Sequence, residues 1–226
     1  MSKNEILKKY FNFRNLSIKN QSHRSRKVLA QNEIDTIFFL LEKFYNFKNT
    51  NEIKILDVGC GDKFLEPVLK KKNFLYEGID INRADFNVDK LPYDDNSFDI
   101  VISLAVIEHI KTPENYLSEI YRVLKNNNGL LFLSTPNWIY SHKDFYNDYT
   151  HVRPYTKVSL TNILSDFNFI DIHVVPGLRK KPFWQYTIPY AEFFAKNLPF
   201  TGDATFVPNI LKGKARSLFA IAKKYT

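Results

Sequence analysis

The sequence is poor in residue types that would point to other classes of protein. Its 226 residues include one cysteine, one methionine and seven glycines. The single cysteine, Cys60, excludes an intrachain disulfide framework and a metal cluster built from cysteines. No apolar run approaches the roughly 18 residues that span a bilayer, and the first residues are polar and charged, unlike an apolar signal core. We therefore expect a soluble, cytoplasmic protein.

The overall composition is that of a globular protein. Hydrophobic residues make up 44% of the chain and charged residues 25%, and a chain of this length suits one domain of about 100–250 residues. The net charge of +8 favours a phosphate-bearing partner or an anionic membrane surface. Because lysines and asparagines are spread along the whole chain, we interpret the charge chiefly as a solvated surface, and no DNA partner is expected.

Strand-like and helix-like patterns of apolar residues alternate along the chain. Predicted strands cover residues 53–58, 74–80, 84–88, 98–104, 129–135 and 169–175, and predicted helices cover 28–45, a short stretch around 65–69, 112–124 and 156–167. Thr112 before Pro113 predicts a helix start with a capping hydroxyl. The alternation indicates an α/β fold with a Rossmann-like doubly wound sheet, mostly parallel with one late antiparallel strand. We expect a helical N-terminal extension (1–50), the core (51–176) and a C-terminal cap of short helices (177–226).

A glycine-containing turn follows the first predicted strand, in the segment DVGCGD (57–62). Gly59 and Gly61 allow the chain to turn tightly and approach a ligand closely. A nicotinamide-binding turn has a third glycine for the pyrophosphate, and Phe64 stands there instead. Asp57 ends the strand, which suits a ligand that carries positive charge and no phosphate. S-adenosylmethionine, with its ammonium and sulfonium groups, is such a ligand.

A second acid follows the second predicted strand. Asp80 comes 21 residues after Gly59, where a carboxylate accepts hydrogen bonds from both hydroxyls of a ribose. Ile81 would then pack against the adenine. The alternative is that Asp57 and Asp80 only cap the turns that follow them.

Five sequence blocks together resemble the class I S-adenosylmethionine-dependent methyltransferases, over about residues 50–175. They are ILDVGCGD, EGIDI, LPYDDNSFDIV, SLAVIEHI and NYLSEIYRVLKNNNGLLFLSTPN. Their order and spacing are similar to the small-molecule branch that includes the ubiquinone-type enzymes.

The resemblance implies a cofactor site at the carboxyl ends of the strands. It implies that the turn of Asp57, Gly59, Cys60 and Gly61 borders the methionine part of the cofactor and that Asp80 binds the ribose. It further implies an adenine contact from Asn87 or Asp89 with Lys90 and Leu91, and places Ser103 and Leu104, followed by Glu108 and His109, beside the methionine arm. For Glu108 and His109, the alternative is a polar start to the next loop. One departure affects the adenine contact: only Asn82 and Arg83 separate EGIDI from the predicted third strand.

Methylation of a hydroxyl requires a general base, and histidine suits this role near neutral pH. The candidates are His109, His142 and His151. We favour His151, because it lies in a loop after the fifth predicted strand together with Asp148, which would orient its ring, and Arg153, which would hold an acid or phosphate. The alternative is that these residues only stabilise a polar loop.

The same loop contains three residues of types that can bind a metal. Asp144, Asp148 and His151 have a suggestive i, i+4, i+7 spacing if the segment is helical. Three such residues arise easily by chance in a polar loop, so no metal is predicted.

The acceptor is indicated only by a weaker resemblance. The segment that begins HVRPYT (151–156) is similar to methyltransferases encoded among bacterial surface-polysaccharide genes, which implies a sugar or glycan-linked hydroxyl. The basic and aromatic run GLRKKPFWQYTIPY (177–190) suggests peripheral membrane contact. The alternatives are an RNA ribose methyltransferase, a non-catalytic Rossmann-like binding protein and a nicotinamide oxidoreductase. The sequence does not determine the oligomeric state.

Overall fold

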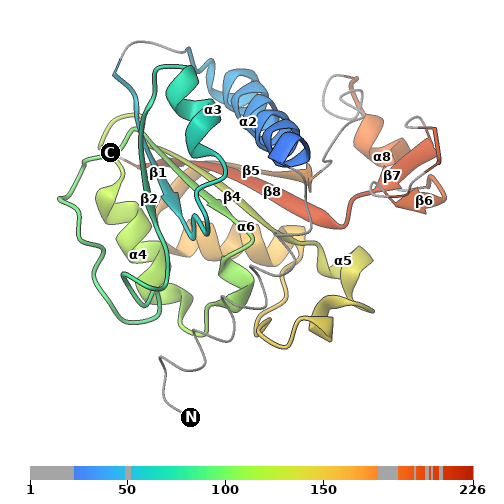
Figure 1. Ribbon diagram of the computed structural model, residues 1–226. Helices are drawn as coiled ribbons and strands as arrows, with labels where there is room; N and C mark the ends of the chain where they lie inside the picture. Colours follow the sequence, from blue (N-terminus) through green and yellow to red (C-terminus); the bar gives the residue numbers. More distant parts are fainter. Residues whose placement is uncertain are drawn as a thin grey trace.

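A six-stranded mixed sheet forms the centre of the protein in the computed structural model (Figure 1). The structure describes residues 23–48, 52–177, 188–195, 197–201, 204, 206–208 and 211–225. The first 22 residues of the predicted N-terminal extension and most of the basic aromatic run at 177–190 therefore lie outside the described residues.

The strands confirm the predicted mostly parallel α/β sheet. They are β1 (Lys54–Val58), β2 (Leu75–Ile79), β3 (Ile100–Leu104), β4 (Leu130–Pro136), β5 (Phe169–Gly177) and β8 (Ser217–Lys224). Their order across the sheet is β2-β1-β3-β4-β8-β5. The first four are parallel to one another, whereas β8 runs antiparallel to both β4 and β5. Because β1 lies between β2 and β3, the chain changes direction across the sheet at this point, where α/β proteins bind ligands.

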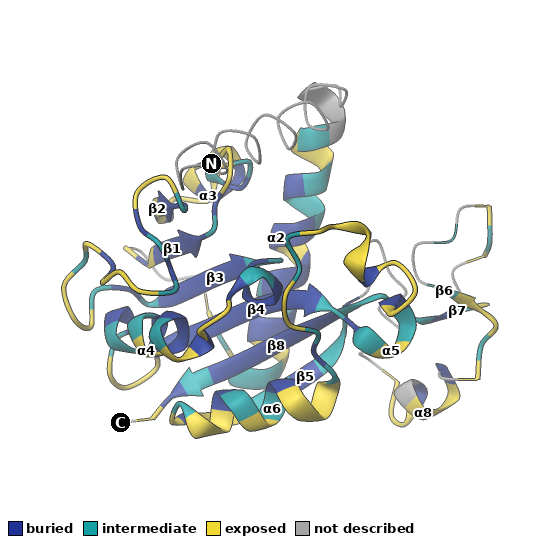
Figure 2. Ribbon diagram, turned by 90° about the horizontal axis from the view of Figure 1, so that it is seen from below, coloured by how far each residue is buried: buried dark blue, intermediate teal, exposed yellow. Residues whose placement is uncertain are grey.

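Helices cover both faces of the sheet (Figures 1 and 2). The larger ones are α2 (His23–Tyr45), α3 (Glu66–Lys71), α4 (Pro113–Val123) and α6 (Lys157–Asp166). Shorter elements are η1 (Ile107–His109), α5 (Trp138–Ser141), η2 (Phe145–Asn147), α8 (Ala191–Ala195), β6 (Phe200–Thr201) and β7 (Lys212–Lys214). Among the residues that the structure places, no helix combines the length and apolar character needed to cross a membrane.

The strands divide the hydrophobic core into two layers because alternate side chains point to opposite faces. On one face, residues such as Ile55 and Phe132 pack with the buried side of α2 and with α3. On the other, Leu56 and Leu131 pack with α4 and α6. Burial on both faces explains why the strands are nearly continuous apolar runs.

The predicted third strand is wrong. Residues 84–88 form successive turns in which the backbone N–H groups of Arg83 and Ala84 donate to the carbonyl of Asp80. Those of Val88 and Asp89 donate to the carbonyl of Asp85. Since these bonds are local, the segment does not extend the sheet, and β2 remains an edge strand.

The predicted capping role of Thr112 is also wrong. Thr112 precedes α4, but its side chain makes no capping bond to that helix. Its hydroxyl donates instead to the backbone carbonyl of Asn87, at 2.8 Å. A further difference is β8, which lies in the segment predicted to be a cap of short helices and supplies the antiparallel strand of the core sheet.

The packing of α2 predicts the effect of shortening one of its side chains. Ile34 is fully buried, whereas Val28 on the same helix is 50% exposed. Replacing Ile34 with Ala should lower the free energy of unfolding by about 2–5 kcal/mol, because it leaves a cavity in the core. Val28→Ala should change it by less than about 0.5 kcal/mol. Urea denaturation measures both, and equal effects would show that α2 is not part of the core.

Candidate functional site

The turn after β1 brings the ends of β1 and β2 together. The backbone N–H groups of Gly59 and Cys60 donate to the carbonyl of Ile79 at 2.8 and 3.1 Å, and that of Gly61 donates to the Asp80 carboxylate at 2.6 Å. Gly59 has a φ of +80°, and a Cβ there would lie 2.2 Å from Cγ2 of Val106. Glycine is therefore required at this position.

Asp57 is a buried acid at the carboxyl end of β1. It is 2% exposed, and its Oδ2 accepts a hydrogen bond of 2.9 Å from the hydroxyl of Tyr76. Burial raises the pKa of Asp57 to about 7, the bond from Tyr76 opposes this increase, and the charge of Asp80 adds to it. A nearby cation favours the charged form of a buried carboxyl group such as this one. The site therefore fits a ligand that carries an ammonium or sulfonium group.

Asp80 has a structural role and retains capacity for a ligand. Its two oxygens accept the backbone N–H groups of Gly61 and Ile81, each at 2.6 Å. Each carboxylate oxygen accepts more than one hydrogen bond, so these contacts also leave Asp80 able to bind ribose hydroxyls.

Burial, together with the charges of Asp57 and Asp80, raises the pKa of Cys60 to about 12. Its thiol is therefore uncharged at neutral pH.

The residues predicted to meet the adenine edge hold the surrounding loops. Oδ1 of Asn87 accepts the backbone N–H groups of Lys111 and Thr112 before α4. Oδ2 of Asp89 accepts the N–H of Asp85. The adenine contact from Asn87 or Asp89 stays a prediction. Among their predicted companions, Lys90 is exposed and Leu91 is buried.

Ser103 fixes the ends of β1 and β3 relative to each other. Its hydroxyl is buried, donates to the carbonyl of Val58 at 2.9 Å and accepts from the hydroxyl of Tyr116 at 2.6 Å. Leu104, which ends β3, is half-buried. The contact of Ser103 and Leu104 with the methionine arm of the cofactor stays a prediction. The hydrogen bonds of the Ser103 hydroxyl go to Val58 and Tyr116.

The loop that contains His151 is held against the segment after β3. The backbone N–H groups of Val152 and Arg153 both donate to the carbonyl of Glu108, at 2.8 and 3.1 Å. The rings of His109 and His151 consequently lie 4.7 Å apart, measured between their centroids. His109, predicted as a cofactor contact, therefore belongs to the same group of side chains as the predicted base.

The carbonyl of Phe145, rather than Asp148, orients His151. Nδ1 of His151 lies 2.6 Å from this carbonyl oxygen, whereas its Nε2 is 3.9 Å from Asp148. Asp148 instead accepts from the hydroxyl and the backbone N–H of Thr150. No hydrogen bond to the His151 ring supports the predicted orienting role of Asp148, because Thr150 donates to that carboxylate.

Two other predicted residues lie outside this group. His142 is exposed, with its Nδ1 3.3 Å from the carbonyl of Ile139. Arg153 is exposed and donates to the carbonyl of Lys111 at 3.2 Å.

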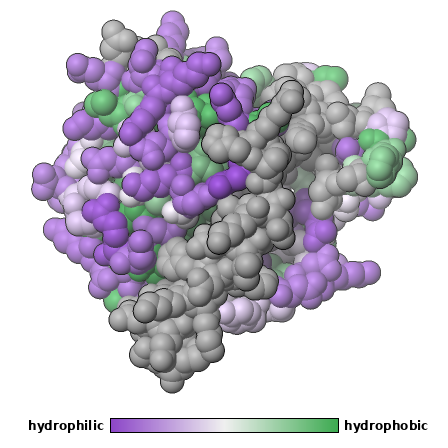
Figure 3. Space-filling view, in the orientation of Figure 1, coloured by the Kyte–Doolittle hydropathy of each residue, from purple (hydrophilic) through white to green (hydrophobic). Residues whose placement is uncertain are grey.

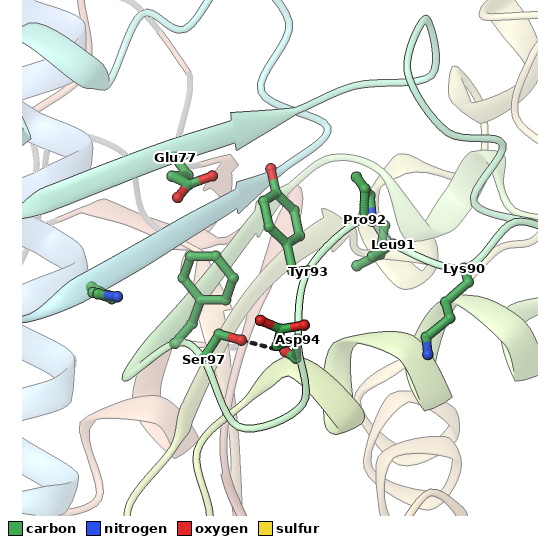
Figure 4. Close-up of a pocket in the computed structure, with 9 residues that line it drawn as sticks. Glu77, Lys90, Leu91, Pro92, Tyr93, Asp94 and Ser97 are labelled. Carbon is green, nitrogen blue, oxygen red and sulfur yellow. Dashed lines mark hydrogen bonds between the residues drawn. The ribbon is translucent and has the colours of Figure 1, made fainter.

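A hollow of about 460 Å³ lies near the beginning of β1 and the middle of β2 (Figure 4). Glu77 and Tyr93 line one side of it, and Lys90 lies at the other. The acids and glycines of the predicted cofactor site lie instead at the carboxyl ends of these strands. Because this hollow contains neither Asp57 nor Asp80, we do not assign the cofactor to it.

A family described as a methyltransferase domain matches residues 23–174, which is more than half of the chain. The chain belongs to this methyltransferase-domain family. The match begins where α2 begins and ends within β5, so it includes the glycine turn, both acids and the histidine pair.

Curated relatives of this methyltransferase match over part of their length. A protein of Mycobacterium tuberculosis described as a probable S-adenosylmethionine-dependent methyltransferase is 34% identical over 137 residues, covering 52% of this chain and 49% of the relative. A ubiquinone biosynthesis O-methyltransferase of Pelagibacter ubique is 26% identical over 108 residues, covering 40% and 45%. The chain thus spans about half the length of the curated relatives it matches.

Solved structures support the fold. A S-adenosylmethionine-dependent methyltransferase from Archaeoglobus fulgidus has a TM-score of 0.54 at 20% identity, covering 84% of this chain and 94% of that one. One from Mesorhizobium loti also has a TM-score of 0.54, at 14% identity, covering 79% and 94%. The predicted methyltransferase family and Rossmann-like fold are confirmed, and the match to a relative described as S-adenosylmethionine-dependent supports the predicted cofactor.

The raised pKa of Asp57 predicts how cofactor affinity depends on pH. The charged cofactor favours the carboxylate form of Asp57, which predominates above about pH 7 and is lost below it. Affinity for S-adenosylmethionine should therefore fall about tenfold between pH 8 and pH 6. Isothermal titration calorimetry across this range measures the change.

Two variants serve as comparisons for this titration. Asp57→Asn should bind more weakly at pH 8 and lose most of the pH dependence, because the amide does not titrate. Asp94→Asn removes an exposed carboxylate and should behave like the natural protein. An unchanged pH profile in Asp57→Asn would contradict the assigned role of Asp57.

Proposed function

We propose that this methyltransferase methylates a hydroxyl group of a small sugar or glycan-linked acceptor, and that His151 is the residue on which activation of this hydroxyl depends. The main support is the pair of imidazoles, His109 and His151, in the loops that follow β3 and β4. The similarity to a ubiquinone biosynthesis O-methyltransferase supports oxygen as the methylated atom.

The reaction makes simple demands on the protein. The bound cofactor would supply a methyl group that is already electrophilic, because its sulfur is positively charged. A bond forms between the acceptor oxygen and the methyl carbon, the carbon–sulfur bond breaks, and the hydroxyl proton is lost. Asp57 and Asp80 bind and orient the cofactor, and correct positioning of the two reactants contributes about 7–11 kcal/mol. The remaining task is removal of the proton, which histidine performs near neutral pH.

The surroundings of His151 suit a polar acceptor. Asp148 is half-exposed and Arg153 is exposed, and both lie on the loop that carries His151. Such groups bind hydroxyls and, in the case of arginine, carboxylate or phosphate oxygens. Together with the resemblance of HVRPYT to polysaccharide-modifying methyltransferases, this favours a sugar over an apolar substrate.

Peripheral membrane contact is a secondary proposal. The aromatic residues Tyr190, Phe193, Phe194 and Phe206 are each at least 65% exposed, and Figure 3 shows a hydrophobic patch over the region of β6 and β7. Exposed aromatic rings together with a positive net charge suit an anionic lipid surface. Sedimentation with vesicles containing anionic lipid tests this contact.

RNA ribose methylation is the alternative for the acceptor, favoured by the net charge of +8. Phosphate contacts make binding strongly dependent on salt. A steep salt dependence of RNA binding would support this alternative, whereas sugar methylation that does not change with salt would support the proposal.

The proposal predicts the effect of removing His151. With labelled S-adenosylmethionine and a panel of small hydroxylated acceptors, His151→Ala should lower kcat by about 10²–10⁴-fold. Its affinity for S-adenosylhomocysteine should stay nearly unchanged, because His151 is assigned to the acceptor. His142→Ala, an exposed histidine near the same loop, serves as the matched control. Full activity of His151→Ala, or methylation of amines alone, would contradict the proposal.

A further inference from the structure

Three potential metal ligands converge where η1 meets the loop of His151. Glu108, His109 and His151 each offer one ligand atom, and these atoms all lie within 4.8 Å of one another. Glu108 and His109 are neighbours in the chain, whereas His151 is brought to them by the backbone bonds to the Glu108 carbonyl.

Hydrogen bonds fix His151 in one tautomer. Nδ1 of His151 lies 2.6 Å from the carbonyl oxygen of Phe145. Since a carbonyl only accepts, Nδ1 carries the proton, and in the neutral ring Nε2 carries the lone pair.

The same reasoning applies to His109. The hydroxyl of Thr150 lies 2.5 Å from the Asp148 carboxylate, which only accepts, so the hydroxyl proton points to Asp148. The oxygen of Thr150 must then accept from Nδ1 of His109, at 2.9 Å, which leaves the lone pair on Nε2. Metal-binding histidines are held in this way, with the second ring nitrogen donating to a carbonyl or a polar side chain.

Glu108 supplies the negative charge. Glu108 is only 1% exposed, and its Oε2 accepts a hydrogen bond of 3.1 Å from the hydroxyl of Thr135. A carboxylate is costly to bury unless positive charge or strong hydrogen bonds compensate. A divalent cation bound to the two neighbouring imidazoles would supply that positive charge.

Tyr155 adds a polar group near this carboxylate. Burial raises the pKa of its hydroxyl, and the charge of Glu108 contributes to the increase. Within the part of the chain that the structure describes, this buried hydroxyl makes no hydrogen bond. It is available to a water molecule or an acceptor oxygen bound beside Glu108.

We infer that Glu108, His109 and His151 bind a divalent cation of the first transition row. Two imidazoles and one carboxylate suit such cations better than Mg²⁺ or Ca²⁺, which prefer oxygen ligands. Three protein ligands leave coordination positions open for another molecule. The sequence predicts no metal, and this site also differs from the group of Asp144, Asp148 and His151. In the structure, Asp144 pairs with Arg216, and Asp148 accepts a hydrogen bond from Thr150.

The cation would deepen the proposed function, on which this part of the inference rests. An acceptor hydroxyl bound to a divalent cation loses its proton more readily, because the cation stabilises the resulting oxyanion. The proton passes to solvent, the oxygen attacks the methyl carbon, and the carbon–sulfur bond breaks. His151 then acts as a ligand rather than as the general base predicted from the sequence.

Direct metal binding tests the inference without an acceptor. Chelator-treated protein is titrated with Zn²⁺ by calorimetry and with Mn²⁺ by electron paramagnetic resonance. We expect one cation per chain. His109→Gln and His151→Gln should each weaken metal binding by at least about 100-fold. Loss of a residue that only hydrogen-bonds a metal ligand already lowers metal affinity by about 10- to 100-fold.

Two controls separate ligand loss from misfolding. His142→Gln should bind metal like the natural protein, and each variant should keep the circular dichroism spectrum and the cooperative urea unfolding of the natural protein, which shows that it folds. Absence of stoichiometric binding, or equal binding by natural protein and ligand variants, would overturn the metal site.

The outcomes for the metal and for the proposed function are distinct. If no metal binds but His151→Ala still abolishes sugar methylation, the proposed function stands and His151 is the base. If metal binds at the three residues but no hydroxylated acceptor is methylated, the metal site stands and the proposed function fails.

Discussion

The buried carboxyl group of Asp57 is the constraint around which the site is organised. It lies at the end of β1, where the strand order reverses, and the only side-chain hydrogen bond found for it among the described residues comes from Tyr76. The glycine turn that follows is tied to the end of β2 through Asp80. The same arrangement that stabilises the turn therefore places two carboxylates next to each other, and a cationic ligand relieves the electrostatic cost of burying them.

A second group of side chains completes the same edge of the sheet. The bonds from Val152 and Arg153 to the carbonyl of Glu108 join the loop after β4 to the segment after β3. The parallel direction of β1, β3 and β4 brings these loops to the edge that carries Asp57. The proposed positions of the methyl donor and of the acceptor-activating group thus depend on one feature of the fold, the shared carboxyl ends of parallel strands.

Much of the fold could be predicted from the sequence, because strong local patterns agree with the final structure. Apolar runs that end in acids predict β1 and β2, and the helix predicted over 156–167 corresponds to α6 (Lys157–Asp166). The segment 84–88 resembles a strand because Ala84 and Phe86 alternate with polar residues, but these two side chains are buried from successive turns.

The strand β8 was missed for a different reason. Its sequence, SLFAIAKK, follows a proline-rich segment, and one of its pairing partners, β4, is distant in the chain.

The grouping of His109 with His151 also required the structure. The two residues are 42 positions apart, and their proximity depends on backbone hydrogen bonds to Glu108. Such bonds can form with almost any side chain, so the residue types do not indicate them. For the same reason, the sequence suggested Asp148 as the partner of His151, whereas the structure supplies a backbone carbonyl. Side-chain roles that depend on main-chain contacts are the part of the site that sequence patterns do not reveal.

A crystal structure of the protein with S-adenosylhomocysteine would show whether Asp57 and Asp80 bind the cofactor. We expect the amino acid part of the ligand to lie against the turn of Gly59 and Gly61 near Asp57, with both ribose hydroxyls hydrogen-bonded to Asp80. A complex in which the turn is empty, or in which the two carboxylates face away from the ligand, would contradict it.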